Sequence, residues 1–365
     1  MYKVRSSGLA DFSRLCKCSP TVHACPLGYR RAGCDAQHSG DSYIIKQENL
    51  MITFRPMNIE TDAADMARIF SHTKVEPITT ETAREWWTLR KDEIRFTTLA
   101  LDENGQAIGY WDVEREAWMQ PGRFFLKVIV APEFRNRKLG TQMYADALRV
   151  AREHGATELE STIREDDLIS NKFVEKRGFK VEYHTFESTL DLNAFDPTKY
   201  DDLLARIHAE GFRFFSLAEA GVTEENKRKL YEINRATFLE SSGSDGTFSD
   251  FDSFSNDVFN ASWFRADTQI LASLSDRWVG LAAIGIYKAD NYAYNAFTGV
   301  LREFRGRGLA QALKLQTIAL AKKEGMSYIR TNNDSNNEPM LHINRKLGYQ
   351  PEPGYYRILC KLDAA

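Results

Sequence analysis

The stretch VLREFRGRGLA, residues 300–310, decides how the chain folds. A β-rich run that starts at Tyr292 ends at Val300, a turn with two glycines follows, and a helical pattern begins at Leu309. Where a strand leads through a turn into a helix, the first N–H groups of the helix lack partners and point out of its positive end. The stretch therefore predicts an anion site at the start of a helix.

The residue types in this turn favour a diphosphate. Gly306 and Gly308 lack a Cβ, so a ligand can approach the backbone closely. Ala310 keeps the next position small, and Arg305 and Arg307 add positive charge. The turn has neither the Gly-Lys-Ser/Thr ending of an ATP-binding loop nor the Gly-x-Gly-x-x-Gly spacing of a dinucleotide turn. An Arg/Gly turn that only starts a helix is the structural alternative.

The chain also contains an internal repeat. The following residues recur 170 positions later: Val130, Glu133, Phe134, Arg135, Arg137, Leu139, Gly155, Lys176 and Gly178. Solenoid repeats have periods of roughly 20 to 50 residues, so a period this long indicates a duplicated domain. With 365 residues, of which 43% are hydrophobic, the chain is long enough for two domains.

Hydrophobic periodicity and turn residues predict the same order of elements in both copies. In the first copy we expect strand 52–56, helices near 62–71 and 80–91, a hairpin turn at 104–105, strand 124–130, a helix from Leu139 closed by Gly155, strand 157–162, a helix ending at 177 and strands over 180–191. In the second copy we expect strand 212–217, a helix from about Thr223, strands 268–274, 278–287 and 292–300, and a helix over 309–323 closed by Gly325.

Taken together, these features resemble the GNAT acyltransferase superfamily. Its signature after the fourth strand is Arg/Gln-x-x-Gly-x-Gly/Ala, which Arg305, Gly308 and Ala310 match. The family's fifth strand and the helix after it, with a Leu-Gly-aromatic ending, are matched by Thr331, Asn333, Asn337, Met340, Ile343, Asn344, Leu347, Gly348 and Tyr349. The two copies extend from Met51 to near Leu362.

The resemblance implies an α/β (α+β) fold with two tandem GNAT domains, each a mixed, mostly antiparallel central sheet flanked by helices. This arrangement is similar to that of tandem enzymes such as mycothiol synthase. We expect a disordered N-terminal extension over residues 1–50, a first domain over 51–191, a linker helix within 192–211 and a second domain over 212–363. One interpretation of the extension is a start codon placed too far upstream.

The resemblance also implies a site for acetyl-CoA as co-substrate, where the fourth and fifth strands separate at a bulge. The backbone N–H near Val300 would face the thioester carbonyl and stabilise the oxyanion, and Asn333 would take part in catalysis. The implied cofactor-binding residues are Val300, Leu301, Arg305, Gly306, Arg307, Gly308, Leu309, Ala310, Asn333 and Asn337. Capping of the helix near residue 336 is the alternative role of Asn333 and Asn337.

An acceptor amine must lose a proton before it attacks, so the site needs a base or a path to one. Asp334 lies nearest in sequence to the expected reaction centre, although a carboxylate after a strand is typical of a turn. Relatives commonly have a Tyr that protonates the departing thiolate. This Tyr corresponds to Asn344 in the second copy and to Val174 in the first. Neither side chain here can act as an acid. The candidates to replace it are His342, Tyr355 and Tyr356.

The first copy departs from the signature at Lys138, which stands where the second copy has Gly308. Arg135, Gly140 and the small Thr141 are retained. A side chain so close to the expected diphosphate weakens the case for a cofactor in the first copy, although a lysine can also bind phosphate. We expect this copy to keep the fold and to have a structural or substrate-shaping role.

The acceptor side is indicated by residues 240–259, which combine acidic and aromatic side chains that suit a cationic amine. These side chains are Glu240, Asp245, Asp250, Asp252 and Asp257, with Phe248, Phe251, Phe254 and Phe259. A solvated acidic loop is the alternative interpretation.

Composition narrows the classes of partner and compartment. The net charge of -3 gives no overall basic surface for nucleic acid or membranes. No apolar run approaches the roughly 20 residues of a membrane helix. Cys16, Cys18, Cys25 and Cys34 lie in the extension with spacing unlike that of paired zinc ligands, so we expect no metal site. With only Cys360 in the rest of the chain, we expect a cytoplasmic protein. We also expect a monomer or homodimer.

The sequence therefore predicts an acetyl-CoA-dependent N-acetyltransferase that acetylates a primary amine of a small molecule by direct attack on the thioester. The second domain would carry the reaction. A non-catalytic CoA-binding or regulatory protein is one alternative, suggested by Asn344. An acyltransferase with another donor, such as a longer acyl-CoA or an aminoacyl-tRNA, is another, although the intact loop and the net acidity argue against tRNA.

Overall fold

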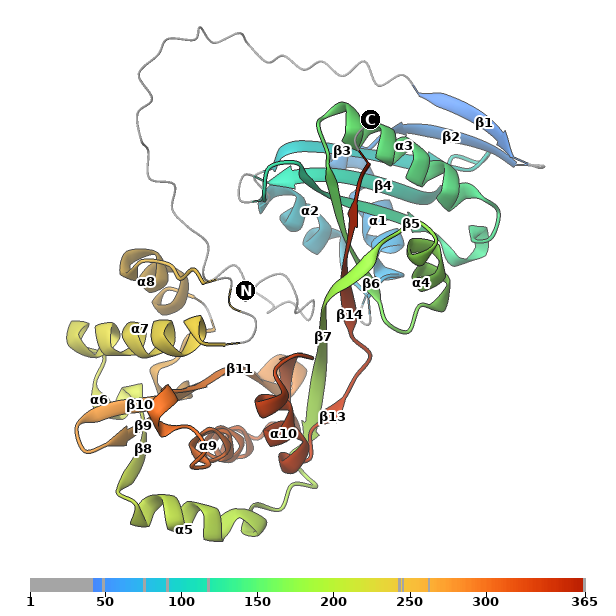
Figure 1. The fold of residues 1–365 in the computed structure, drawn as a ribbon. Coiled ribbons are helices and arrows are strands. Elements are labelled where there is room, and N and C mark those ends of the chain that lie inside the picture. The colour runs from blue at the N-terminus through green and yellow to red at the C-terminus, as the bar shows by residue number, and fades with distance from the viewer. Residues whose placement is uncertain are drawn as a thin grey trace, which may run out of the picture. The chain divides into compact units, whose positions relative to one another are not determined.

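The computed structural model describes residues 42–363 except 48, 49, 75, 76, 90, 91, 117, 118, 242, 243, 245 and 262. This part of the chain divides into two compact units, whose elements are labelled in Figure 1. The N-terminal unit comprises the described residues up to Tyr183 together with those from Tyr355 onward. The C-terminal unit comprises His184–Gly354. The cysteine-rich segment and its predicted lack of a metal site lie outside the described residues.

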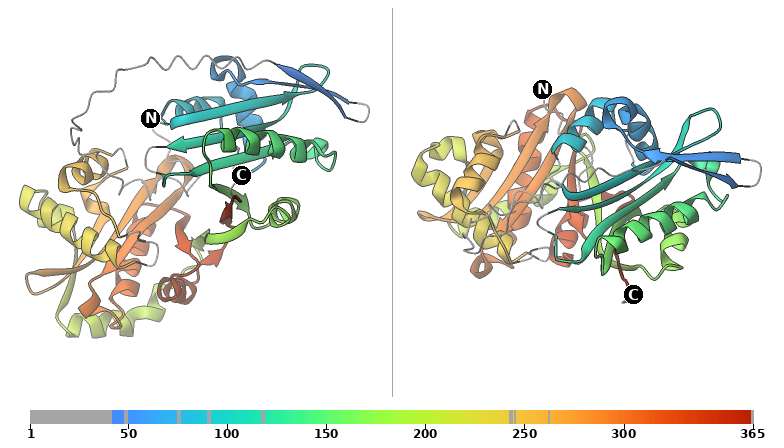
Figure 2. Two further views of the ribbon diagram at one scale, coloured as in Figure 1. Left: turned by 45° about the horizontal axis from the view of Figure 1, so that its top comes forward. Right: turned by 90° about the horizontal axis from the view of Figure 1, so that it is seen from above.

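The N-terminal unit contains a sheet with the strand order β1-β2-β3-β4-β5-β6-β14. The strands are β1 (Tyr43–Gln47), β2 (Leu50–Pro56), β3 (Asp92–Leu101), β4 (Ala107–Glu116), β5 (Arg123–Val130), β6 (Glu158–Arg164) and β14 (Tyr355–Lys361). Only β5 and β6 run parallel among these neighbours. Figure 2 shows α1 (Ile59–Ser71) and α2 (Thr80–Leu89) on one face and α3 (Leu139–Glu153) on the other, with α4 (Leu168–Glu175) following β6.

The C-terminal unit repeats this plan with the strand order β7-β12-β11-β10-β9-β8. The strands are β7 (Lys180–Asp191), β8 (Phe212–Ser216), β9 (Gln269–Leu274), β10 (Arg277–Tyr287), β11 (Tyr292–Val300) and β12 (Tyr328–Asp334), and the short β13 (Gln350–Pro351) pairs with β7. The helices are α5 (Asp201–Ala209), α6 (Leu217–Ala220), α7 (Glu224–Leu239), α8 (Phe251–Phe259), α9 (Leu309–Lys323) and α10 (Glu338–Leu347). Only β11 and β12 run parallel among the paired strands described here.

The helices after β5 and β11 anchor the two cores. In α3 the predicted stripe is confirmed, because Leu139, Met143 and Ala147 are buried in the N-terminal core. In α9 the buried residues spread over more of the surface and include Leu309 and Leu313. Both copies thus have the predicted mixed, mostly antiparallel sheet flanked by helices, and the fold class is confirmed.

Each unit completes its sheet with a strand that lies in sequence beside the other copy. β14 pairs with β6 and places Ile358 and Cys360 in the N-terminal core. The part of β7 from Thr185 to Asp191 pairs with β12 and places Leu190 in the C-terminal core. The compact units therefore differ from the contiguous segments 51–191 and 212–363 that we expected. The alternating pattern of a strand predicts which face is buried but not which distant strand it joins.

Residues 43–47 were expected to belong to a disordered extension, and this prediction was wrong. They form β1, which pairs antiparallel with β2. The ring of Tyr43 stacks on Phe54 with 4.8 Å between centroids, and its hydroxyl donates to Asp146 at 2.5 Å. The free edge of β2 supplies backbone hydrogen bonds that a short segment cannot make alone.

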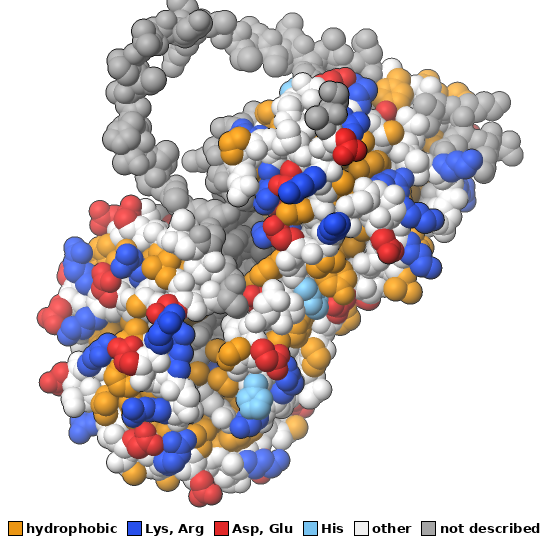
Figure 3. All heavy atoms as spheres, viewed as in Figure 1, with side chains coloured by type: hydrophobic (Ala, Val, Ile, Leu, Met, Phe, Trp, Pro, Cys, Tyr) orange, Lys and Arg blue, Asp and Glu red, His pale blue; other side chains and the backbone are white. Residues whose placement is uncertain are grey.

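The expected linker helix is α5, and it is an integral part of the C-terminal unit. Its Ile207 is buried in the same cluster as Leu309 and Leu313 of α9. On the face shown in Figure 3, basic and acidic side chains are interspersed over both units, in keeping with the net charge of -3.

Candidate active site

The strands β11 and β12 separate toward their C-terminal ends. They pair only from Tyr292, opposite Tyr328, to Asn295, opposite Thr331. At the same point Ala283 of β10 pairs with Phe297 but the next residue pairs with Asn295, so β11 contains one extra residue as a bulge. After the bulge, β11 continues to Val300 with no partner on its β12 side among the described strands. We refer to this side of residues 296–300 as the open edge of β11.

The backbone N–H of Val300 lies along the open edge of β11. Leu301 N donates to Val279 O at 3.0 Å, so these two residues form a hydrogen-bonded pair. Val300, opposite Gly280, belongs to the next, non-hydrogen-bonded pair, in which the N–H and C=O point away from β10. The Val300 carbonyl accepts from Arg305 Nε at 2.9 Å, whereas its N–H has no acceptor among the described residues. This N–H is therefore available to a ligand, whereas that of Leu301 is not.

The turn after β11 presents further unpaired N–H groups. Gly306 and Gly308 have φ angles of 76° and 87°, and Gly308 is the N-cap of α9, with no side chain capping the helix. The amides of residues 306–310 donate to no acceptor in the described part of the chain. These amides lie at the positive end of α9, which is the arrangement that binds phosphate groups in proteins.

Gly308 is favoured by its conformation, with a φ of 87°, and by its close surroundings. A Cβ at this position would lie 2.8 Å from Leu203 Cδ1 and 3.4 Å from Arg206 Nη2, both on α5. Arg206 Nη2 also donates to the carbonyl of Arg307 at 3.0 Å. The helix α5, expected to be a linker, thus packs against the turn. The repeat pattern did not reveal this contact, because α5 lies outside the matched copies.

Arg305 is held by contacts within the protein. Its Nε donates to Val300 O, and its Nη2 lies 2.8 Å from Glu240, which also pairs with Arg302 at 3.1 Å. The guanidinium therefore links the turn to the ends of β11 and α7. Arg307 is half-exposed, and its closest carboxylate, Glu210, is 3.9 Å away, so Arg307 can contribute charge to a bound anion.

Asn333 is buried, and its amide is occupied within the protein. Its Nδ2 donates to Phe186 O at 3.0 Å and to Ser188 Oγ at 2.9 Å, and its Oδ1 accepts from Asn344 Nδ2 at 2.7 Å. This network occupies both hydrogens of the Asn333 amide and one lone pair of its oxygen. The catalytic and cofactor-binding roles expected for its side chain are therefore not supported by the structure, because the residue points into the core between β12, β7 and α10.

Asn337 and Asp334 take the capping and turn roles that were their alternatives. Asn337 is the N-cap of α10, and its side chain accepts from Met340 N at 3.3 Å. Asp334 Oδ1 accepts from Asn336 N at 2.8 Å, as in a turn after a strand. Asn337 still lies at the start of a helix beside β12, where its amide nitrogen has no partner among the described residues.

The turn of the N-terminal copy keeps the same backbone without the glycines. Arg135 has φ −69° and ψ 163°, against −69° and 164° for Arg305, and its Nε donates to Val130 O at 3.2 Å. Lys138 has φ 61° and ψ −2°, so it occupies the left-handed conformation that Gly308 has in the other copy. However, β5 pairs with β4 without a register shift. The N-terminal copy therefore retains the turn but lacks the bulge.

This strained conformation predicts that Lys138→Gly stabilises the N-terminal unit. A non-glycine residue in the left-handed conformation lowers the free energy of unfolding by about 1–2 kcal/mol. A glycine lowers it by about 0.5–1 kcal/mol, because glycine has more conformational freedom in the unfolded chain. We expect a net gain of roughly 0.5–1 kcal/mol in the free energy of unfolding. Urea denaturation measures it, with Arg137→Gly as the matched control in the same turn. A destabilised Lys138→Gly protein would mean that the lysine side chain makes contacts that outweigh its strain.

The aromatic residues expected to form an amine pocket instead pack together. The ring of Tyr231 on α7 lies 5.4–5.7 Å from those of Phe248, Phe251 and Phe254. Asp250 is the N-cap of α8 and accepts from Ser253 N at 2.8 Å. The rings of Phe251 and Phe254 thus join α8 to α7, and the amine site expected over 240–259 stays a prediction. The prediction for Asp245 lies outside the described residues.

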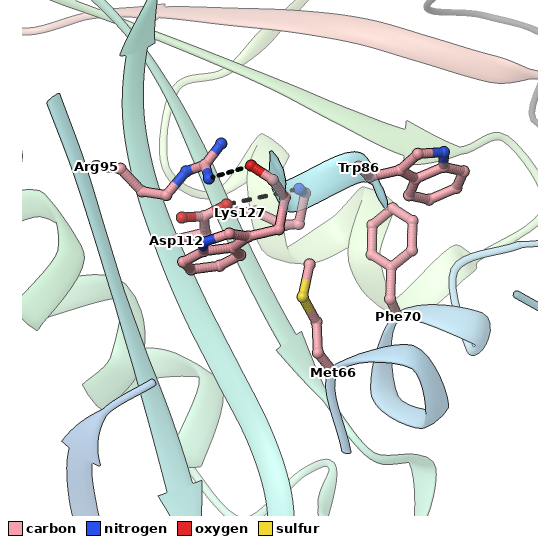
Figure 4. Close-up of a pocket in the computed structure, with 7 residues that line it drawn as sticks. Met66, Phe70, Trp86, Arg95, Asp112 and Lys127 are labelled. Carbon is pink, nitrogen blue, oxygen red and sulfur yellow. Dashed lines mark hydrogen bonds and ion pairs between the residues drawn. The ribbon is translucent and has the colours of Figure 1, made fainter. Parts of the chain in front are cut away.

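A small pocket lies in the N-terminal unit between α1, α2 and the sheet (Figure 4). It is lined by Met66, Phe70, Trp86, Trp87, Arg95, Asp112 and Lys127. Its charged groups have partners within the protein. Lys127 Nζ lies 3.8 Å from Asp112, and Arg95 stacks on Trp87 at 4.5 Å and lies 3.5 Å from Glu114, which is outside the lining. These pairings account for the charged residues without a ligand.

The described residues contain neither a cluster of metal ligands nor a helix that could span a membrane. No group of three or more His, Cys, Asp or Glu residues there is arranged to hold a metal ion. None of the helices in residues 42–363, the gaps aside, is long and apolar enough to cross a membrane.

The acetyltransferase (GNAT) family model matches the chain twice, at residues 63–179 and 227–349. No curated protein matches the sequence. The structure of a GCN5-related N-acetyltransferase from Sphaerobacter thermophilus is similar, with a TM-score of 0.61, 19% identity, and coverage of 85% of this chain and 95% of that one.

Two further solved structures share the fold. A tandem GNAT protein from the clavulanic acid biosynthesis pathway, solved without AcCoA, has a TM-score of 0.59 and 18% identity and covers 86% of this chain and 99% of its own. A GCN5-related glucosamine N-acetyltransferase region of a fungal multi-domain GH3 beta-N-acetylglucosaminidase has a TM-score of 0.61 and 16% identity, over 84% of this chain and 38% of that one. The chain therefore belongs to the acetyltransferase (GNAT) family, with two tandem copies of its acyl-transfer domain.

Proposed function

We propose that the chain is an acetyl-CoA-dependent N-acetyltransferase whose C-terminal unit transfers the acetyl group to a primary amine of a small molecule. The observation that supports this most directly is the row of unpaired N–H groups at residues 306–310, which continues at the open edge of β11 with the N–H of Val300. The N–H groups of residues 306–310 fit a diphosphate, and the N–H of Val300 fits the oxygen of a thioester.

The residues of the turn fit this co-substrate. Gly306 and Gly308 hold positive φ and leave the amides uncovered, and Arg307 adds a positive charge. Leu309 is buried and fixes the first turn of α9, and Ala310 keeps the neighbouring position small. Acetyl-CoA supplies an activated acyl group when bound. The chain itself holds the diphosphate and orients the thioester against the Val300 N–H, a donor worth roughly 3 to 4 kcal/mol of barrier in other oxyanion sites.

The N-terminal unit is proposed to shape or support the protein without catalysing transfer. Its turn keeps the backbone of a phosphate site, but β5 lacks the bulge of β11, and the side chain of Lys138 is exposed at the position of Gly308. We further propose a cytoplasmic protein that acts as a monomer or homodimer, with a small-molecule amine and not nucleic acid or membrane as its partner, in keeping with its net charge of -3.

The test is release of free thiol from acetyl-CoA across a panel of small primary amines, with an aminoacyl-tRNA and longer acyl-CoAs as alternative donors. We expect at least one amine to raise thiol release about 100-fold or more above the amine-free rate, as a positioned nucleophile should. Tight acetyl-CoA binding without turnover on any amine would instead support a non-catalytic CoA-binding protein. Faster transfer from another donor would mean that the protein uses that donor and not acetyl-CoA.

A further inference from the structure

The interiors of the two units differ at a set of equivalent positions. Four pairs are related by the repeat of 170 residues: Tyr144 and Lys314, Ile163 and Asn333, Val174 and Asn344, and Phe179 and Tyr349. A fifth pair follows from strand pairing, because Ile358 lies opposite Ser161 of β6 while Ser188 lies opposite Thr331 of β12. At each pair the N-terminal unit has the more apolar residue. We call the C-terminal set Ser188, Lys314, Asn333, Asn344 and Tyr349 the polar cluster.

Part of the polar cluster is tied together by hydrogen bonds. Asn333 donates to Ser188 Oγ and accepts from Asn344 Nδ2. The backbone N–H of Tyr349 donates to Asn344 O at 3.0 Å, which places Tyr349 directly beside α10. The cluster therefore spans β7, β12 and the end of α10.

Lys314 joins this cluster from α9 and is its only charged member. Its side chain is 1% exposed, and its Nζ lies 4.8 Å from the centroid of the Tyr349 ring. Lys314 Nζ, Asn344 Oδ1 and Tyr349 Oη are all buried without a hydrogen-bond partner among the described residues. Burial lowers the pKa of Lys314 to about 7, and no neighbouring charge contributes to this shift.

The N-terminal unit shows that the fold does not need these polar groups. There Tyr144 packs edge-on against Phe173 and Phe179, with centroids 6.0 and 6.4 Å apart. A buried charge without a partner is costly, and well-packed apolar residues of similar volume are often more stable. The C-terminal unit thus carries buried polar groups that lower its stability. Residues that lower the stability of a fold in this way are concentrated at functional sites.

The position of the cluster links it to the open edge of β11. Asn333 lies two residues beyond Thr331, the last residue of β12 that pairs with β11, and Asn344 contacts Asn333 at that point. Lys314 lies on the helix whose first amides form the anion site. The cluster therefore begins at the point where β12 separates from β11.

We propose that Lys314 is the proton donor for the departing thiolate, with Asn344 and Tyr349 completing the polar path to it. In this step an N–H bond of the Lys314 ammonium breaks and an S–H bond forms, which leaves Lys314 as a neutral amine. The acceptor amine releases one proton in each turnover, and the return of one proton restores the Lys314 ammonium, so the protons balance. This inference rests on the acetyl-CoA-dependent function proposed above.

The surroundings of Lys314 give the step a defined pH dependence. Tyr349 is the titratable group that faces it, and burial raises the pKa of that hydroxyl, so Tyr349 stays neutral. Asn344 from α10, Asn333 from β12 and Ser188 from β7 carry no charge. Because the donor must be protonated, turnover should fall as the pH rises above about 7.

The first test compares Lys314→Met with Lys323→Met, an exposed position on the same helix. We expect Lys314→Met to lower kcat about 100-fold, to leave the KM for acetyl-CoA within about twofold, and to remove the falling limb of the pH profile, because general acids contribute about 10²–10⁴-fold. Lys323→Met should behave as the wild type. The melting temperature of Lys314→Met should equal or exceed that of the wild type, which separates loss of chemistry from loss of folding.

A second readout does not depend on turnover. The thiol of bound coenzyme A is titrated by the absorbance of its thiolate, and a neighbouring ammonium should lower its pKa in the wild type relative to Lys314→Met. Equal thiol pKa values, or an active wild type whose kcat is unchanged in Lys314→Met, would overturn the role of Lys314 alone. A wild type that neither binds acetyl-CoA nor releases thiol would overturn the proposed function and this inference with it.

Discussion

Gly308→Glu should weaken acetyl-CoA binding at least about 100-fold, or about 2.8 kcal/mol. Gly308 has a φ of 87°, which costs a residue with a Cβ about 1–2 kcal/mol, and the new Cβ would lie 2.8 Å from Leu203 Cδ1. The carboxylate would also stand beside the unpaired amides of residues 306–310 and repel a diphosphate. Isothermal titration with acetyl-CoA measures the change.

The matched control is Lys138→Glu, which places the same carboxylate at the equivalent position of the N-terminal turn. We expect this variant to bind acetyl-CoA within about twofold of the wild type, because the proposed site lies in the other unit. A Gly308→Glu protein that is folded and binds as tightly as the wild type would contradict the site. If Lys138→Glu were the weaker binder, the cofactor would belong to the N-terminal unit.

A chain that ends at Gly354 should lose the folded N-terminal unit, although the deleted residues follow the C-terminal unit in sequence. The deletion removes β14, its pairing with β6 and the buried side chains of Ile358 and Cys360. We expect at least about 5 kcal/mol of destabilisation, from these buried side chains and the lost strand hydrogen bonds. Hydrogen exchange of residues 92–183 measures it, since amides protected in the full chain should exchange freely.

The control for this deletion is a chain that ends at Leu362, which keeps all of β14 and the bond from Leu362 N to Thr157 O at 2.9 Å. It should retain the exchange protection of the full chain. If ending the chain at Gly354 destabilised only residues 184–354, then β14 would belong to the C-terminal unit, as its place in the sequence suggested.

The repeat in the sequence was enough to predict two copies of one fold and most of their elements. The helix predicted over 309–323 matches α9, and the turn at Asn104 and Gly105 joins β3 to β4. These features depend on local signals, namely glycine positions and hydrophobic period. The places of β14 and β7 in the sheets could not be predicted, because they depend on pairing between distant residues, such as Tyr355 with Arg164 and Asp191 with Tyr328.

The site was predicted in part, for the same reason. As the local pattern indicated, β11 ends at Val300, and Gly306 and Gly308 lie in the turn before α9 with positive φ angles. Asn333 was assigned to the site although it is part of a buried network, because sequence does not reveal which face of β12 is covered. Lys314, which we propose as the proton donor, was not predicted, although the sequence carried a signal: it is a charged residue within a core helix, and the repeat aligns it with Tyr144.

The central claim is that the amides at the start of α9 bind the diphosphate of acetyl-CoA and so place its thioester at the open edge of β11. A crystal structure of the protein soaked with acetyl-CoA tests it most directly. We predict diphosphate oxygens within hydrogen-bonding distance of the amides of residues 306–310 and the thioester oxygen at the N–H of Val300, with the matching turn at Lys138 empty. A cofactor bound only at residues 136–140, or bound away from both turns, would contradict the account.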